Sequence, residues 1–287
     1  MTEIKYVTVL GAGTMGAGIA QVCASAGCRA TLFDVDDDAL EQGFDRIRRN
    51  LDKGLELGKL SSQEHHDSLN RLQGAHDLAF AVERADLVVE AVPEVLELKQ
   101  RIFREVDAAA PPHAILATNT SSLSIAGISE AVADPSRVVG LHFFNPVHLM
   151  KLVEVVWGPR TSDAVRDAAT DFVRRLGKEP VVVKDSPGFA SSRLGIVLGM
   201  EAIRMVEEGV AAPEDIDRAM ELGYRHPMGP LRLTDLVGLD VRLGIAQYLH
   251  ETLGSEAFRP PDLLRRMVEE GKLGKKSGRG FYDWSEG

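Results

Sequence analysis

Residues 6–27 read YVTVLGAGTMGAGIAQVCASAG, and this stretch decides the fold. It begins with an apolar, β-branched run that predicts a strand, and it continues with apolar residues at a helical period until Gly27 stops the helix. The glycine-rich turn Gly11–Gly16 joins the two. Strand, glycine turn and helix in this order are typical of the unit that opens a doubly wound, mainly parallel sheet.

The same turn has the spacing of a dinucleotide site. GxGxxG alone is weak evidence, but here a second predicted strand follows the helix and ends at an acid, Asp34. The helix N-terminus attracts a pyrophosphate, and a carboxylate accepts ribose hydroxyls while it repels a 2′-phosphate. We therefore expect NAD rather than NADP. The expected contacts are Gly11, Ala12, Gly13, Thr14, Met15, Gly16 and Asp34. The alternatives are an ordinary strand–helix turn and a solvated strand-end acid.

Apolar runs and helical segments alternate as far as about residue 184, which predicts a Rossmann-type, mainly parallel sheet wrapped by helices. Strands are expected at residues 6–10, 30–33, 87–91, 115–117, 138–142, 152–156 and 181–183. Between Asp34 and Leu87 no convincing strand is found, and residues 38–73 read as two polar helices. We therefore expect a helical hairpin that projects from the sheet.

A domain boundary is expected at KDSPGF, residues 184–189, because Ser-Pro-Gly is turn chemistry and the strand signals stop there. Residues 1–185 are the predicted NAD-binding domain, and residues 186–287 are a predicted all-α domain for substrate binding and dimerisation. Its expected helices lie at 193–209, 213–223, 240–254 and 260–271. The first is apolar around most of its circumference, which favours burial on two sides and a homodimer formed by this domain.

Composition limits the classes of partner. The net charge of −10 over 287 residues argues against general nucleic-acid binding. No apolar stretch approaches the roughly 18 residues of a membrane span, and the N-terminus suits a first strand better than a signal peptide. Cys23 and Cys28 are interpreted as reduced core residues of a cytoplasmic protein. No metal site is expected.

The candidate catalytic residues lie in GLHFFNPVHLMKLVEVV, residues 140–156. His142 ends a predicted strand, where the ligand sites of open α/β sheets lie, and histidine can take a proton near neutral pH. Glu154 lies within the next apolar strand, where an unpaired charge is costly to bury. A His–Glu pair would satisfy both residues. The alternative is a core histidine with an unrelated glutamate, and His148 is interpreted as an exposed loop residue.

Two further segments are predicted to open at the same edge of the sheet. ATNTSSLSI, residues 117–125, is rich in hydroxyl groups and follows an apolar strand. It can cap a helix or donate a hydrogen bond to a substrate oxygen. EAVPE, residues 90–94, places Glu94 beside the expected cofactor.

These motifs together identify a family resemblance. The chain is similar over essentially its whole length to the short-chain L-3-hydroxyacyl-CoA dehydrogenases, which include bacterial 3-hydroxybutyryl-CoA dehydrogenases. HFFNP with Glu154 is far more specific than the glycine loop, and HPMGPLRLTDLVGLD (226–240) and KKSGRGFYDW (275–284) are typical of the family's helical domain. The resemblance implies reversible, NAD-dependent oxidation of an L-3-hydroxyacyl-CoA, a step used in fatty-acid β-oxidation among other pathways.

The resemblance also implies roles for residues of this chain. His142 matches the family's base and Glu154 its partner; Ser121 matches a residue that hydrogen-bonds the substrate hydroxyl near the nicotinamide. Asn145, Glu94 and Lys99 match positions that contact NAD. The helical hairpin implies coenzyme A contacts, for which Lys53 and Lys59 are candidates. Because acids are interleaved with these lysines and their neighbouring arginines, a solvated helix face is the alternative.

One position departs from the family pattern. Where members usually carry an asparagine of the catalytic constellation, GFASSRLG has Ser192, a shorter residue with one donor. The departure leaves substrate placement open and keeps several alternatives in view. These are a dehydrogenase acting on 3-hydroxyadipyl-CoA or on a hydroxy acid without CoA, and a non-catalytic NAD-binding protein. Relatives that use a lysine base are disfavoured because His142 and Glu154 are both present.

Overall fold

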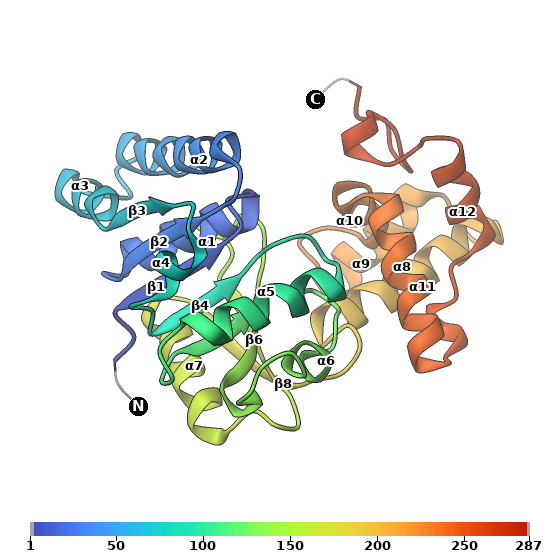
Figure 1. Cartoon of the computed structure of the whole chain (residues 1–287). Helices are drawn as coiled ribbons and strands as arrows, with labels where there is room; N and C mark the ends of the chain where they lie inside the picture. Colours follow the sequence, from blue (N-terminus) through green and yellow to red (C-terminus); the bar gives the residue numbers. More distant parts are fainter. Residues whose placement is uncertain (1–2, 286–287) are drawn as a thin grey trace. The chain divides into compact units, whose positions relative to one another are not determined.

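The computed structural model describes residues 3–285, which divide into two units (Figure 1). The first unit ends at Ser186 and the second begins at Pro187. The first unit alternates strands with helices, whereas the second contains helices and the turns that join them. The change from one pattern to the other therefore occurs at the Ser-Pro-Gly turn.

An eight-stranded sheet forms the centre of the first unit, in the order β3-β2-β1-β4-β5-β6-β7-β8. Neighbouring strands are parallel except β6 and β7, which are antiparallel. The strands are β1 Tyr6–Leu10, β2 Arg29–Phe33, β3 Leu72–Ala75, β4 Leu87–Glu90, β5 Ile115–Thr118, β6 Val138–Phe143, β7 Leu152–Trp157 and β8 Glu179–Lys184. The predicted mainly parallel sheet is confirmed.

The central strands are near-continuously apolar because helices cover the sheet. β4, β5 and β6 are buried along their whole length. The helices of this unit pack in two groups: α1 contacts α2 and α3, whereas α5 contacts α4 and α6. Besides α2 and α3, the helices of this unit are α1 Thr14–Ser25, α4 Leu78–Val82, α5 Leu96–Ala109, α6 Ile125–Ser129 and α7 Asp163–Arg175.

The segment between β2 and β4 contains the expected helical hairpin and one strand that was not expected. α2 (Asp37–Glu56) and α3 (Ser62–Asn70) form the hairpin, which lies beside β3 in Figure 1. β3 then pairs in parallel with β2 at the edge of the sheet, so the prediction of no strand between Asp34 and Leu87 was wrong. Its sequence, LQGA, lacks an apolar run because its two central residues are exposed.

The second unit is all-α, as predicted. Its helices are α8 Ser191–Glu207, α9 Pro213–Tyr224, α10 Pro230–Val237, α11 Leu239–Leu253 and α12 Asp262–Glu269. The short α10 was not predicted as a separate helix, although Pro230 stands at its first position, where proline is favoured. Within residues 3–285, no helix is long and apolar enough to cross a membrane.

Two buried carboxylates fasten the closing segment of the chain to the second unit. Asp235 is fully buried and accepts hydrogen bonds from the backbone N–H groups of Phe281 and Tyr282 and from the indole N–H of Trp284, at 2.9, 2.9 and 2.8 Å. The Tyr282 hydroxyl donates to Asp217 at 2.7 Å. Burial and the neighbouring Asp217 raise the pKa of Tyr282 well above its usual value, so this hydroxyl stays a donor.

Candidate active site

His142 and Glu154 form the centre of the candidate site. They face one another directly across the antiparallel β6–β7 pair, and His142 Nδ1 lies 2.7 Å from Glu154 Oε2. Both residues are buried, at 8% and 1% exposure. A carboxylate this deeply buried requires a hydrogen-bonded partner. When Nδ1 donates to Glu154, Nε2 is the ring nitrogen that can accept a proton from a substrate.

His142 lines a hollow of about 330 Å³ at the carboxyl ends of the central strands. Its lining combines apolar and polar groups: Met15, Ala91, Val92, Glu94, Asn119, Ser121, His142, Phe143, Phe144 and Asn145. The His142 and Phe144 rings pack with their centroids 4.4 Å apart. Ligands of open α/β sheets bind at this end of the strands, so the hollow is the candidate substrate site.

The glycine loop borders this hollow through Met15 and has the geometry that a dinucleotide requires. Gly11 has a φ of +98°, and a Cβ on Gly16 would lie 1.8 Å from the Gly11 carbonyl oxygen. A Cβ on Gly13 would meet nothing within 4 Å, so open space lies beside the backbone there. No side chain caps the N-terminus of α1, which leaves its dipole and N–H groups for an anion. These residues fit a bound pyrophosphate.

Asp34 holds the glycine loop from the end of β2. Its Oδ2 accepts the Ala12 backbone N–H at 2.7 Å, and its Oδ1 accepts that of Asp36 at 3.2 Å. The carboxylate thus stands beside the loop in the position where a ribose would follow a pyrophosphate. Its charge favours a ribose with free hydroxyls over one that carries a 2′-phosphate.

A buried charge network lies under the hollow. Lys99, only 1% exposed, places Nζ 2.7 Å from Glu90 Oε1 and 3.3 Å from Glu94 Oε2. Glu90, which is fully buried, also accepts the Val92 N–H and the Thr118 hydroxyl, each at 2.7 Å. Both oxygens of Glu90 therefore have donors. Sequence analysis did not select Glu90; its signal was an acid at the end of an otherwise apolar strand.

Glu94 connects this network to the serine-rich loop. Its Oε1 accepts the Thr120 hydroxyl at 2.5 Å and the Ser121 backbone N–H at 2.8 Å, with the Ser121 hydroxyl at 3.2 Å. Burial alone would raise the pKa of Glu94, but Lys99 and these hydrogen bonds outweigh burial and lower it. Glu94 is therefore ionised at neutral pH and fixes Ser121 at the edge of the hollow.

Two asparagines also belong to this edge. Asn119 Oδ1 accepts the Phe143 backbone N–H at 2.8 Å and so ties the end of β5 to the end of β6. Asn145 lines the hollow one residue after Phe144 and is exposed. Asn119 was not predicted from the sequence, in which it reads as part of a polar turn.

The remaining predicted residues lie elsewhere in the chain. Ser192 lies in the first turn of α8, in the second unit. Lys53 lies in the last turn of α2 and pairs with Glu56 at 3.1 Å, with both side chains exposed. Lys59 follows that helix and is close enough to His148, together with Lys178, to lower the pKa of the imidazole, although partial desolvation of the ring is the larger cause. His148 is exposed, as expected.

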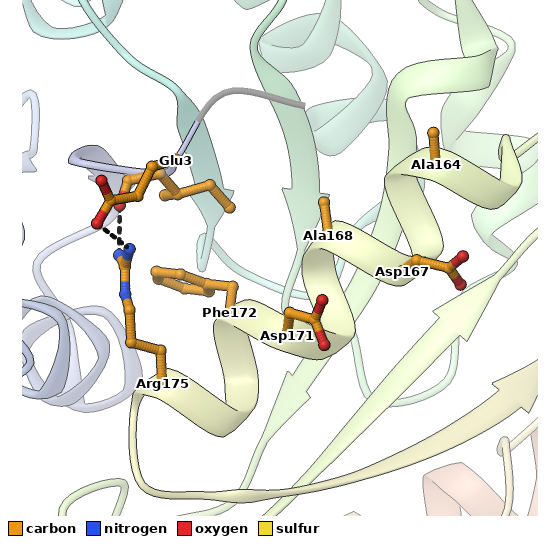
Figure 2. Close-up of a pocket in the computed structure, with 8 residues that line it drawn as sticks. Glu3, Ala164, Asp167, Ala168, Asp171, Phe172 and Arg175 are labelled. Carbon is orange, nitrogen blue, oxygen red and sulfur yellow. Dashed lines mark hydrogen bonds and ion pairs between the residues drawn. The ribbon is translucent and has the colours of Figure 1, made fainter.

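A second hollow, of about 450 Å³, lies beside α7 at the amino end of β1 (Figure 2). Asp167 and Asp171 extend from α7, while the Arg175 guanidinium turns toward Glu3, 3.6 Å away, and donates to the Ile4 carbonyl. Its cation is thus already bound within the protein. Because it lies at the amino end of a strand, this hollow lacks the position of a ligand site in a parallel sheet.

Comparison with known proteins gives one family for the two units. Residues 6–186 match the family described as 3-hydroxyacyl-CoA dehydrogenase, NAD binding domain, and residues 188–284 match 3-hydroxyacyl-CoA dehydrogenase, C-terminal domain. A probable 3-hydroxybutyryl-CoA dehydrogenase of Bacillus subtilis is 47% identical over 99% of both chains. A 3-hydroxyadipyl-CoA dehydrogenase of Escherichia coli is 43% identical over 99% of this chain and 60% of its own length. The crystal structure of (S)-3-hydroxybutyryl-CoA dehydrogenase from Ralstonia eutropha matches with a TM-score of 0.96 at 39% identity, and the match covers 99% of this chain and 100% of that one.

Proposed function

Because this chain belongs to the 3-hydroxyacyl-CoA dehydrogenase family of NAD-dependent oxidoreductases, we propose that it oxidises an L-3-hydroxyacyl-CoA, such as 3-hydroxybutyryl-CoA, to the 3-ketoacyl-CoA. The observation that carries this proposal is the buried His142–Glu154 hydrogen bond at the edge of a hollow that the glycine loop also borders. A base and a hydride acceptor are the two agents that removal of a proton and a hydride from a secondary alcohol requires.

In the proposed mechanism His142 acts as general base. Its Nε2 takes the proton of the 3-hydroxyl group as the C3–H bond breaks and the C3–O bond becomes a carbonyl. Bound NAD⁺ supplies the acceptor for the hydride. Glu154 fixes the imidazole tautomer and stabilises the imidazolium as it forms, because a buried carboxylate 2.7 Å away favours the charged ring. Ketone reduction uses the same groups in reverse.

The other residues at the edge of the hollow position the two reactants. We assign the Ser121 hydroxyl to the substrate oxygen, since Glu94 and the loop fix it beside the hollow. Asn145 is assigned to the nicotinamide end of the cofactor, while the glycine loop and Asp34 are assigned to its pyrophosphate and ribose. Glu94 and Lys99 are also assigned to the cofactor site, where Glu94 holds the serine-rich loop and Lys99 pairs with Glu94. Residues 1–185 then form the NAD-binding domain.

Residues 186–287 are assigned as the domain for substrate binding, and Ser192 is assigned as a contact of the acyl group. Serine replaces the asparagine usual in the family, so one donor does the work of a larger amide. Coenzyme A is assigned to Lys53 and Lys59 of the helical hairpin, because exposed lysines attract its phosphates.

We further propose that the protein is a homodimer built through its helical domain. Large apolar side chains of the second unit are well exposed, with Leu222 and Tyr224 each at 76% and Leu194 at 68%. Exposed apolar side chains of this size favour burial in an interface. Light scattering after size exclusion should give twice the chain mass of 31.2 kDa.

We also propose that the protein acts in the cytoplasm. Cys23 and Cys28 are both buried and are both free thiols. They are close together in the sequence, yet they form no disulfide with each other. Free thiols kept in a core suit a reducing compartment. Fractionation of the source cells should place the protein with cytoplasmic markers.

One set of assays tests the proposed function against its alternatives. Oxidation of NADH is followed with acetoacetyl-CoA and with free acetoacetate, and the reaction is repeated with NADPH. The proposal predicts fast turnover of the thioester with NADH and little turnover of the free acid. Equal rates with thioester and acid would favour a non-CoA dehydrogenase, and no turnover of either would favour a non-catalytic NAD-binding protein.

A further inference from the structure

Glu90 is a buried carboxylate that the proposed mechanism does not use. It ends β4 and accepts hydrogen bonds at 2.7 Å each from the Val92 backbone N–H, the Lys99 ammonium and the Thr118 hydroxyl. The Thr118 oxygen in turn accepts the Thr120 N–H at 3.3 Å, so its own proton is the one directed at Glu90. Three donors stabilise the charged form of the carboxyl group, and Glu90 is therefore ionised.

Lys99 lies between Glu90 and a second carboxylate. Its Nζ is 2.7 Å from Glu90 Oε1 and 3.3 Å from Glu94 Oε2, and it donates to the Val92 carbonyl at 3.3 Å. Three acceptors match the three N–H groups of an ammonium, so Lys99 is charged. Two carboxylates and one ammonium leave this network with a net charge of −1. The shorter contact is to Glu90, so Lys99 mainly neutralises Glu90.

The remaining charge of the network lies at the hollow. The Glu94 side chain is 37% exposed, whereas those of Glu90 and Lys99 are each 1% exposed. Burial would raise the pKa of Glu94, but Lys99 and the hydrogen bonds of the serine-rich loop lower it overall, so Glu94 is ionised at neutral pH. Among the described residues that line the hollow, Glu94 is the only acid, and no lysine or arginine is present to neutralise it.

The charge of the nicotinamide ring changes in the reaction. The ring carries one positive charge in NAD⁺ and none in NADH. The next step rests on the proposed function, in which the nicotinamide binds in this hollow. A carboxylate there attracts the oxidised ring and has little effect on the reduced one. The other carboxylate near the hollow is Glu154, which lies on β7 behind His142 and is not part of the Glu90 network.

We propose that Glu90 is a positioning residue that holds Lys99 away from Glu94, so that Glu94 keeps an uncompensated negative charge that favours the oxidised nicotinamide over the reduced one. Without the charge of Glu90, the ammonium would pair with Glu94 alone and neutralise it. Glu90 thus acts on the cofactor through two other side chains. Favouring the oxidised ring lowers the reduction potential of the bound cofactor, so bound NADH becomes a stronger hydride donor to a ketone.

The test is calorimetric titration with NAD⁺ and with NADH, separately and without substrate, at neutral pH and constant salt. Glu90→Gln keeps the shape of the side chain and removes a charge that does not line the hollow. The ratio of the Kd for NAD⁺ to the Kd for NADH should rise about tenfold, since one charge several ångströms away in a partly solvated site has an effect of this order. Glu94→Gln removes the charge at the hollow itself and should raise the same ratio by a similar factor.

The matched control is Thr118→Val, which removes a hydrogen bond to Glu90 and leaves every charge of the network in place. It should lower Tm, because a buried carboxylate oxygen loses its donor, while the ratio of the two Kd values stays within twofold of wild type. A merely structural role of Glu90 would make the two variants alike.

An unchanged ratio in Glu90→Gln would overturn the inference, and so would an equal change in Thr118→Val. If Glu90→Gln does not fold, an unchanged ratio in Glu94→Gln overturns it instead. The proposed function is tested separately, by turnover of acetoacetyl-CoA in the wild type. A wild type that binds both forms of the cofactor but reduces no 3-ketoacyl-CoA would overturn the proposed function, and the Kd ratios would still decide the inference.

Discussion

His142 and Glu154 stand directly opposite one another on β6 and β7, the antiparallel pair of the sheet, with Nδ1 and Oε2 2.7 Å apart. Directly opposed residues of an antiparallel pair have their side chains on the same face of the sheet. The reversal of β7 therefore brings together two residues that are twelve positions apart in the chain. Each supplies what the other needs in a buried environment: a donor for the carboxylate and a fixed tautomer for the imidazole.

Two glycines of the nucleotide loop are predicted to respond differently to the same substitution. Gly16→Ala places a Cβ 1.8 Å from the Gly11 carbonyl oxygen, so it should lower Tm and abolish NAD binding. Gly13→Ala meets nothing within 4 Å in the protein, so its Tm should stay within a degree or two of the wild type. Its affinity for NAD should nevertheless fall at least tenfold, because the new methyl group occupies the space of the pyrophosphate. Thermal unfolding and calorimetric titration with NAD measure both effects; unchanged NAD affinity in Gly13→Ala would remove the pyrophosphate from this position.

Asp34 is predicted to set the choice of cofactor. Its carboxylate stands beside the glycine loop, where it accepts the Ala12 N–H at 2.7 Å. The wild type should therefore favour NAD over NADP by at least a hundredfold in kcat/KM, and Asp34→Asn should reduce that ratio about tenfold, since one full charge no longer repels the 2′-phosphate. Steady-state kinetics with the two cofactors check this. A ratio that does not change with the substitution would contradict the assignment of Asp34 to the ribose.

The buried Lys99 is predicted to be much more important for stability than an exposed lysine in a similar pair. Lys99→Met leaves Glu90 fully buried without its cation, which should reduce the free energy of unfolding by about 3–5 kcal/mol. The matched control is Lys5→Met, which removes an exposed pair with Glu3 at 3.2 Å and should have little effect because solvent screens that pair. Urea unfolding gives both values. Similar losses in the two variants would show that the buried network is no stronger than a surface pair.

The pH dependence of stability should report the Glu94 interactions. A carboxyl group whose pKa is lower in the folded than in the unfolded chain stabilises the protein above its unfolded pKa, and this contribution is lost as the pH falls through the folded pKa. The pKa of Glu94 is lowered in the fold. Glu94→Gln should therefore cost stability at pH 7, and the difference from wild type should shrink as the pH falls below about 4.3. Its side chain is 37% exposed, so the difference is moderate. Urea unfolding between pH 7 and pH 3 checks the sign; a difference that grows toward acid would contradict it.

The parts of the fold that could be predicted from the sequence are those whose signal is local. Apolar runs predicted the central strands because these are buried on both faces, and Gly27 predicted the end of α1. β3 could not be predicted in this way: Leu72–Ala75 has exposed central residues, and only its pairing with β2 makes it a strand. The helix α10 was not predicted as a separate element because it is short, with bounds Pro230–Val237.

The residues of the candidate site also divide into those with a local sequence signal and those that only the fold brings together. His142 stood out because a titratable residue ends an apolar strand, and Glu154 because an acid interrupts one. Lys99 and Glu90 pair only when α5 packs against the sheet.

The most direct test of the central claim is the single-turnover rate of NADH formation from 3-hydroxybutyryl-CoA in His142→Gln and Glu154→Gln. Each variant keeps the size of the side chain but removes the base or the charge that supports it. The account predicts that each rate falls about 10²–10⁴-fold, while NAD binding and Tm remain close to wild type. Because the two residues act as one unit, the double variant should be scarcely slower than His142→Gln. A single-turnover rate within threefold of wild type in His142→Gln would contradict the account.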